Sequence, residues 1–142
     1  MSGENDCQGQ TCPGQSKKNR KVAEPAKAGG NKKILVMLTG ERIGHGAGGL
    51  GGLLLLNFLK TLKEMVPDLW RLVLINGAVK LTAEGADALP YLQELAKSGV
   101  SLLVCGTCLN HFQLLEKKQG GETTNMLDIV TSLQLADSVI NL

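Results

Sequence analysis

The sequence is poor in aromatic residues and has no apolar run that could span a membrane. Aromatic residues make up 3% of the 142 residues, which argues against a single-strand nucleic-acid binder, because such proteins stack bases on aromatic rings. The longest apolar run, GLGGLLLLNFL, is far shorter than the roughly 20 residues that cross a bilayer. The first residues, MSGENDCQGQ, contain no apolar signal core. We therefore expect a cytoplasmic protein with neither a membrane nor a nucleic-acid partner.

The sequence also lacks the usual signatures of nucleotide binding and of hydrolytic catalysis. No paired-carboxylate or Ser/His/Asp constellation stands out. The stretch GHGAGG matches G-x-G-x-x-G, but five residues separate it from the preceding apolar run, and the next apolar run ends in Asn76 rather than in an acidic residue. No P-loop Lys-Ser or Lys-Thr follows. We expect no cofactor, and we interpret this loop as a flexible wall whose N–H groups can meet an anion.

Residues 1–32 differ in composition from the rest of the chain. They are rich in Gly, Gln, Lys, Pro and Ser and contain few large apolar side chains, so burial cannot offset the entropy of ordering them. Up to Lys33 there are seven Lys and Arg against three Asp and Glu, whereas the remainder has eight against ten. We predict a disordered basic tail or linker over residues 1–32 and a single domain over residues 33–142.

Apolar runs and amphipathic stretches alternate from Lys33 onward. Strand-like apolar runs occupy residues 34–38, 72–75, 101–104 and 138–142. Helical spacing places Leu55, Leu59, Leu62 and Val66 on one face of one stretch, and Met126, Ile129, Val130 and Leu133 on one face of a later one. A further helix is expected between residues 86 and 99. This alternation predicts an α/β fold, a three-layer sandwich with a mainly parallel sheet.

A pair of cysteines, Cys105 and Cys108, follows the third apolar run in the stretch CGTCLNHF. In a parallel sheet, ligands and chemistry lie beyond the carboxyl ends of the strands, so this pair is expected at the functional edge. We place Cys108 at the start of a short helix, where the partial positive charge of the helix end would favour a thiolate. His111 could favour that thiolate further, and His45 in the Gly-rich loop could orient or protonate a sulfur species.

The spacing of the two thiols leaves several kinds of site open. Zinc needs four ligands, and a complete site would require Cys7 and Cys12 from the tail, so we expect no metal. A thioredoxin-like motif would open a long helix after the first strand of its unit, whereas this pair follows the third strand and precedes a short helix, so a dithiol oxidoreductase fits poorly. Two structural cysteines remain a further alternative. A sulfur or selenium carrier needs an accessible thiolate, nearby N–H donors and a second thiol, but neither a general base nor a metal.

Four stretches carry a resemblance to a known family: ILVMLTGERIGHGAGGLGGLLLLNFLKTL, LINGAVKLTAEG, LLVCGTCLNHF and TNMLDIVTSLQLADSVINL. Together they resemble the DsrE-like domain at the C-terminus of YedF proteins, which are described as sulfurtransferase-like proteins of selenium metabolism. The resemblance runs from about Lys33 to the end of the chain. It implies a flavodoxin-like α/β sandwich, and it implies that relatives of this chain form oligomers, so we expect a homo-oligomer.

The same resemblance implies roles for the two cysteines. Cys105 matches the sulfur-accepting position of the active DsrE-like proteins, which leaves Cys108 as the resolving thiol. YedF proteins also carry an N-terminal SirA/TusA-like domain with a Cys-Pro-x-Pro motif, whereas this chain has only QTCPGQ around Cys12. Sulfur or selenium donor and acceptor proteins, including separate SirA/TusA-like proteins, are therefore the expected partners.

These observations predict a sulfur or selenium carrier, a sulfurtransferase-like protein that works through a cysteine persulfide in the CGTC loop. The expected site residues are catalytic Cys105 and Cys108 with support from His45, His111, Asn76, Gly106 and Thr107. The alternative is a non-catalytic oligomeric interaction or regulatory module in which the cysteines are structural or bind zinc.

Overall fold

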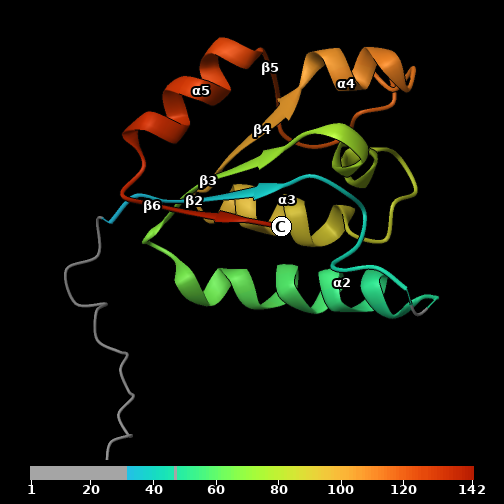
Figure 1. The fold of residues 1–142 in the computed structure, drawn as a ribbon, viewed down its shortest axis with the longest axis horizontal. Helices are drawn as coiled ribbons and strands as arrows, with labels where there is room; N and C mark the ends of the chain where they lie inside the picture. The colour runs from blue at the N-terminus through green and yellow to red at the C-terminus, as the bar shows by residue number, and fades with distance from the viewer. Residues whose placement is uncertain (1–31, 47) are drawn as a thin grey trace, which may run out of the picture. The chain divides into compact units, whose positions relative to one another are not determined.

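The computed structural model describes residues 32–46 and 48–142. The strands of this part are β2 (Ile34–Leu38), β3 (Leu69–Leu74), β4 (Ser101–Cys105), β5 (Glu122–Thr124) and β6 (Ser138–Asn141). The α-helices are α2 (Leu50–Leu62), α3 (Leu89–Lys97), α4 (Gly106–His111) and α5 (Met126–Leu135), and the 3₁₀ helices are η4 (Lys63–Met65) and η5 (Asn76–Thr82). Figure 1 shows these elements along the chain.

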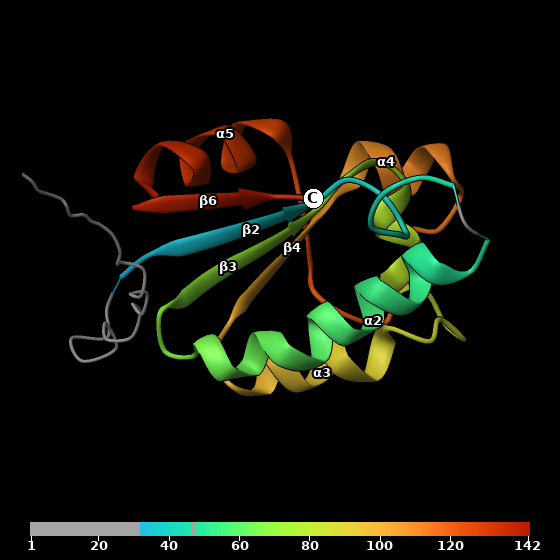
Figure 2. The same cartoon turned by 60° about the horizontal axis from the view of Figure 1, so that its bottom comes forward.

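The five strands form one all-parallel sheet in the order β5-β4-β3-β2-β6. The chain adds β3, β4 and β5 in one direction from β2, and then returns through α5 to place β6 on the other side of β2. Helices α2 and α3 lie on one face of the sheet and α5 on the other (Figure 2). The predicted three-layer α/β sandwich is therefore confirmed, with a sheet that is entirely parallel.

The central strands are buried on both faces, as their continuous apolar runs predict. Leu72, Val73 and Leu74 of β3 are completely buried, and residues 102–105 of β4 are also buried. Side chains of a central strand meet helices on both sides of the sheet, so neither face of the strand needs polar residues. These strands form the rigid platform from which the loops at the carboxyl edge emerge.

Helix α2 buries the face that its helical spacing predicts. Leu55, Leu59 and Leu62 pack into the core. The helix ends at Leu62 and continues as η4, so Val66 lies beyond it and is half-buried. The helix between residues 86 and 99 is confirmed as α3, which begins only at Leu89.

Three features differ from the sequence-based expectation. The loop expected at residues 76–85 contains the 3₁₀ helix η5, and the edge strand β5 was not expected at all. On α5, Ile129 is buried, but Met126 and Val130 are 56% and 43% exposed. The reason is that α5 presents a narrow face, Ile129 and Ser132, to the sheet.

The predicted tail lies almost entirely outside the described residues. Of residues 1–32, the structure describes only Lys32, so the disordered tail and the boundary at residue 33 stay predictions. No helix in the described part of the chain is both long enough and apolar enough to cross a bilayer.

Candidate functional site

The candidate site lies where three connections leave the carboxyl ends of neighbouring strands. The loop after β2, the 3₁₀ helix η5 after β3 and the helix α4 after β4 all begin at this edge of the sheet (Figure 2). Because the strands are parallel and adjacent, their carboxyl ends come together although they are far apart in the sequence. Cys105 is the last residue of β4, and Cys108 lies in the third of these connections.

Cys105 ends β4 and caps the N-terminus of α4. Its side chain is 2% exposed and forms part of the hydrophobic core. Helix α4 begins at Gly106, so the expectation that Cys108 starts the helix is wrong by two residues. The first residue of α4 packs closely against the adjacent strand β5, since a Cβ at Gly106 would lie 3.1 Å from Thr123 Cγ2.

Cys108 lies in the first turns of α4 and is half-buried. Its Sγ accepts a hydrogen bond of 3.0 Å from the backbone N–H of Asn76, the first residue of η5. Asn76 adopts φ 53°, in the left-handed region that Asn tolerates better than most residues. The tight turn after β3 thus aims a main-chain donor at the sulfur from a neighbouring strand.

The surroundings of Cys108 act on its ionisation in opposite directions. Burial raises the pKa of the Cys108 thiol, the Asn76 N–H lowers that pKa, and the neighbouring Cys105 thiol raises it through a hydrogen bond and through charge repulsion. The net result is a pKa above the ordinary value for cysteine. This is opposite to the thiolate stabilisation expected from the sequence, since burial and the second thiol outweigh the single N–H donor.

The remaining predicted residues lie on α4 and in the loop after β2. Gly106 and Thr107 lie between the two cysteines, with Thr107 exposed. His111 ends α4 on the exposed side, and its ring meets the Phe112 ring edge-on at 4.9 Å. His45 is exposed in the loop after β2, where it lines a small hollow of 230 Å³ against α2. Among the described residues, no hydrogen bond joins either histidine to a cysteine.

Three residues that sequence reasoning missed connect the same three segments. The Lys80 Nζ lies 3.3 Å from Glu41 Oε2 and 4.6 Å from the centre of the Phe112 ring. Lys80 comes from η5, Glu41 from the loop after β2, and Phe112 from the end of α4. The only sequence signal was a charged residue four positions after Asn76, which fits a surface lysine equally well.

A larger pocket of 640 Å³ adjoins this contact, between α2 and the segment that leads from η5 toward α3. Its lining includes Leu53, Leu56, Leu81, Glu84 and Asp87, and also Glu41 and Lys80. Nowhere in residues 32–46 and 48–142 do three His, Cys, Asp or Glu side chains gather closely enough to hold a metal ion. The zinc alternative drew on Cys7 and Cys12, which lie outside the described residues.

Comparison with known proteins places the chain among similar folds. The model of the DsrE/DsrF-like family matches residues 32–142. The ychN protein from E. coli is similar in structure, with a TM-score of 0.57 and 22% identity over 78% of this chain and 98% of that protein. MTH1491 from Methanobacterium thermoautotrophicum, a protein of unknown function, has a TM-score of 0.59 and 13% identity over 79% of this chain and 100% of its own.

A third similar structure is BT1422 from Bacteroides thetaiotaomicron, also a protein of unknown function. It has a TM-score of 0.58 and 16% identity over 83% of this chain and 100% of its own. No curated protein sequence is similar enough to match the chain. At these identities the solved structures show a shared fold.

Proposed function

The chain belongs to the DsrE/DsrF-like family, which is associated with sulfur transfer, and on this basis we propose that it carries sulfur or selenium as a cysteine persulfide at Cys105 and Cys108. One observation carries the proposal: a half-buried Cys108 sulfur at the carboxyl edge of the sheet accepts the Asn76 N–H at 3.0 Å and has a second thiol next to it. The N–H is the kind of donor that supports a negatively charged sulfur.

The proposed transfer consists of two exchanges of a sulfur atom between thiols. The Cys108 thiolate attacks the outer sulfur of a donor persulfide, so that a new S–S bond forms while the S–S bond of the donor breaks and the donor leaves as a thiolate. An acceptor thiolate then attacks the outer sulfur on Cys108, and Cys108 leaves as a thiolate. Neither exchange changes the total number of electrons on the sulfur atoms, so the carrier itself returns to its starting state.

Solvent access supports an order of attack that differs from the one implied by the family resemblance. The resemblance assigns the acceptor role to Cys105, but this side chain is 2% exposed, whereas Cys108 is half-buried. We therefore assign the first attack to Cys108. Cys105 then resolves an undelivered adduct by attacking the inner sulfur, which releases hydrosulfide and forms a Cys105–Cys108 disulfide that a dithiol reductant reopens.

The ionisation of Cys108 gives this transfer a pH dependence. Because its pKa lies above the ordinary value, Cys108 is mostly protonated at neutral pH, and only the thiolate attacks. The rate of sulfur loading should therefore rise as the pH increases toward that pKa. A carrier of this kind needs no strong nucleophile, because the donor persulfide is itself reactive and docking brings the two sulfur atoms together.

The partners of such a carrier are proteins that donate and accept sulfur or selenium, and SirA/TusA-like proteins fit this role. Self-association is part of the proposal because α5 leaves apolar side chains uncovered. Met126 is 56% exposed, Leu127 is 76% exposed and Val130 is 43% exposed. Contiguous exposed apolar side chains on one helix are typical of a protein–protein interface.

The same apolar face supports the second candidate function, a non-catalytic interaction or regulatory module. In that case both cysteines are structural, and their sulfur atoms react slowly in the folded protein. Thiol labelling of the native chain at neutral pH distinguishes the two candidates, since a carrier requires that Cys108 reacts before the protein unfolds.

A direct test loads the full chain with sulfur. The protein is incubated with a cysteine desulfurase and cysteine, its intact mass is measured, and the modified cysteine is then located by peptide mapping. We expect one added sulfur on Cys108, its loss in Cys108→Ser, and its retention in Cys105→Ser. No adduct on the wild-type chain, or an adduct confined to Cys7 and Cys12, would contradict the proposed function.

A further inference from the structure

Lys80 makes a second contact between η5 and the end of α4, in addition to the hydrogen bond between Asn76 and Cys108. Asn76 of η5 donates its N–H to Cys108 of α4. Four residues further along each segment, the Lys80 ammonium lies 4.6 Å from the centre of the Phe112 ring. The two segments therefore meet at two points with the same spacing, one at the sulfur and one at the aromatic ring.

Glu41 also contacts the Lys80 ammonium. Its Oε2 lies 3.3 Å from Lys80 Nζ, and the chain passes so close that a Cβ at Gly77 would lie 3.8 Å from the same oxygen. The side chains of Lys80 and Glu41 are 44% and 49% exposed. The contact thus fixes the direction of the lysine without being part of the hydrophobic core.

Helix α4 depends on such outside contacts for its orientation. It spans only six residues, Gly106–His111, and a helix of this length has too few internal hydrogen bonds to be stable alone. Its buried anchor is Leu109, and Phe112 at its end is half-buried. The position of the Cys108 sulfur therefore depends on what holds the two ends of this helix.

We propose that Lys80 is a positioning residue that presses α4 against η5 and thereby keeps the Cys108 sulfur on the Asn76 N–H. This inference rests on the proposed function, because it matters only if Cys108 is the reacting thiol. Lys80 acts through Phe112, while Glu41 fixes the ammonium over the ring. A cation held over an aromatic face at a partly exposed site contributes about 0.5–1 kcal/mol in general, which corresponds to a two- to fivefold change in a population.

The elements that meet near Cys108 carry further ionisable side chains, which include Arg42 and His45 on the loop after β2. The others are Cys105 at the end of β4, Lys80 on η5, Glu41 on the loop after β2 and His111 on α4 itself. A test must therefore separate the positional effect of Lys80 from the direct effect of its charge. The variant Phe112→Leu makes this separation, because it removes the ring and leaves the ammonium paired with Glu41.

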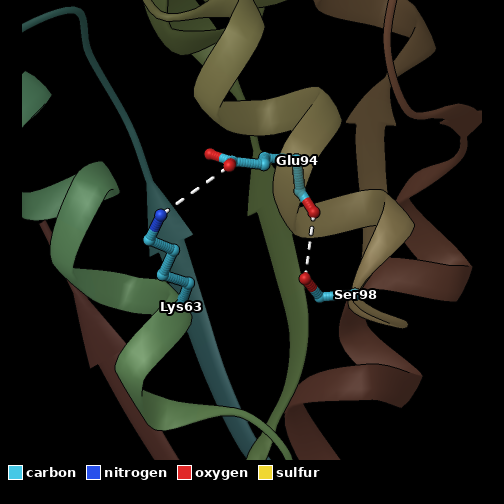
Figure 3. Close-up of polar contacts among 3 residues, drawn as sticks. All are labelled: Lys63, Glu94 and Ser98. Atoms are coloured by element: carbon cyan, nitrogen blue, oxygen red, sulfur yellow. Dashed lines mark hydrogen bonds and ion pairs between the residues drawn. The ribbon is translucent and has the colours of Figure 1, made fainter.

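The chain also offers a matched control ion pair. Lys63 Nζ lies 3.7 Å from Glu94 Oε2, with side chains 50% and 58% exposed, and Figure 3 shows this pair together with the hydrogen bond from Ser98 to the backbone of Glu94. It joins η4 to α3, neither of which carries a thiol. Lys63→Met therefore removes an equally exposed pair while leaving the site untouched.

The experiment measures the alkylation of Cys108 by iodoacetamide in the full chain as a function of pH. Site-resolved mass spectrometry follows the Cys108 peptide, which separates it from Cys7 and Cys12. The midpoint of the profile reports ionisation, and the plateau at high pH reports access to the sulfur. We expect Lys80→Met and Phe112→Leu to move the midpoint upward and to slow alkylation at neutral pH by about two- to fivefold.

Lys80→Arg should restore the wild-type midpoint, since it keeps a cation over the ring, and Lys63→Met should leave it unchanged. Combining Lys80→Met with Phe112→Leu should add no further shift, because both remove the same contact. An unchanged midpoint in Lys80→Met overturns the inference. A shift in Lys80→Met without one in Phe112→Leu also overturns it, because the effect would then be one of charge alone. Failure of sulfur loading in the wild-type chain would count against the proposed function only.

Discussion

Replacing either of two neighbouring glycines in the first turn of α2 by alanine should have opposite effects on stability. A Cβ at Gly51 would lie 2.9 Å from Arg42 Cβ and 2.9 Å from the Ile43 carbonyl oxygen, whereas a Cβ at Gly52 would meet nothing within 4 Å. The Ile43 N–H donates to the Gly51 carbonyl at 3.0 Å, so the loop after β2 lies directly on the helix at this point. We predict that Gly51→Ala destabilises the protein and that Gly52→Ala stabilises it.

The expected difference in unfolding free energy comes from the one effect that the two substitutions do not share. Each replaces a helical glycine by alanine, which stabilises a helix by up to about 1 kcal/mol and by less in its first turn. Only Gly51→Ala also forces a methyl group against a backbone oxygen and a Cβ, which cannot rotate away, and overpacking of this kind costs about 1–3 kcal/mol. Because the helical gain is common to both, the unfolding free energies of the two variants should differ by about 1–3 kcal/mol.

Urea denaturation followed by fluorescence measures this difference, since Trp70 is the single tryptophan of the chain and lies on β3. With a typical slope for a small domain, the two midpoints should be separated by roughly 1–2 M urea, with wild type between them. If Gly51→Ala is as stable as Gly52→Ala, the close approach of the loop to α2 does not exist in solution. Since this loop carries Glu41, that result would also remove one support of Lys80.

Four further predictions concern other parts of the molecule. Because the folded-state pKa of Cys108 is raised, its contribution to stability is complete at neutral pH and is lost as the pH rises above about 8.5; urea titrations should show this decline in wild type but not in Cys108→Ala. Cys105→Ala should lower the Cys108 pKa and speed its alkylation at neutral pH, whereas an unchanged or slower rate would contradict the coupling of the two thiols. Leu127→Glu, at a side chain that is 76% exposed, should shift light scattering of an oligomer toward monomer without changing the unfolding free energy of the domain by more than about 0.5 kcal/mol. Arg71→Met should change the unfolding free energy by less than about 1 kcal/mol, because its lost hydrogen bond to Ser132 is offset by removal of an Nε that is buried without a partner in the described part of the chain; a loss of several kcal/mol would show an unseen partner.

The fold could be predicted from sequence because its strongest signals are long and regular. The runs at residues 34–38 and 102–104 are apolar throughout, and strands buried on both faces require this. Leu55, Leu59 and Leu62 fix the buried face of α2 by spacing alone. Alternation of such elements then leaves parallel crossovers as the favoured topology.

Features that depend on tertiary contact could not be predicted in this way. Strand β5 consists of Glu122, Thr123 and Thr124, which carry no apolar signal, and it exists because β4 offers a free edge. The exposure of Met126 on α5 could not be foreseen either, since periodicity predicts an apolar face but does not tell whether the same chain covers it.

The site divides in the same manner. That both cysteines lie at the carboxyl edge follows from the topology, and the sequence suffices for it. Gly106 at the start of α4 packs against β5, and the Asn76 hydrogen bond comes from a turn after another strand, so both are tertiary contacts. The contact between Lys80 and Phe112 joins residues 32 positions apart, and no local pattern marks it.

Leu142, the last residue of the described chain, is hydrogen-bonded to the end of β2 and to the residue that follows it. Thr39 donates both its backbone N–H, at 2.9 Å, and its hydroxyl, at 2.8 Å, to the carbonyl of Leu142, whose own N–H donates to the Met37 carbonyl at 2.8 Å. Figure 2 shows the C-terminus at the carboxyl edge of the sheet, from which α4 also emerges, so any peptide fused behind Leu142 would begin there. An affinity handle or fluorophore at that end would lie where the proposed partners dock, so capture experiments should carry their label elsewhere.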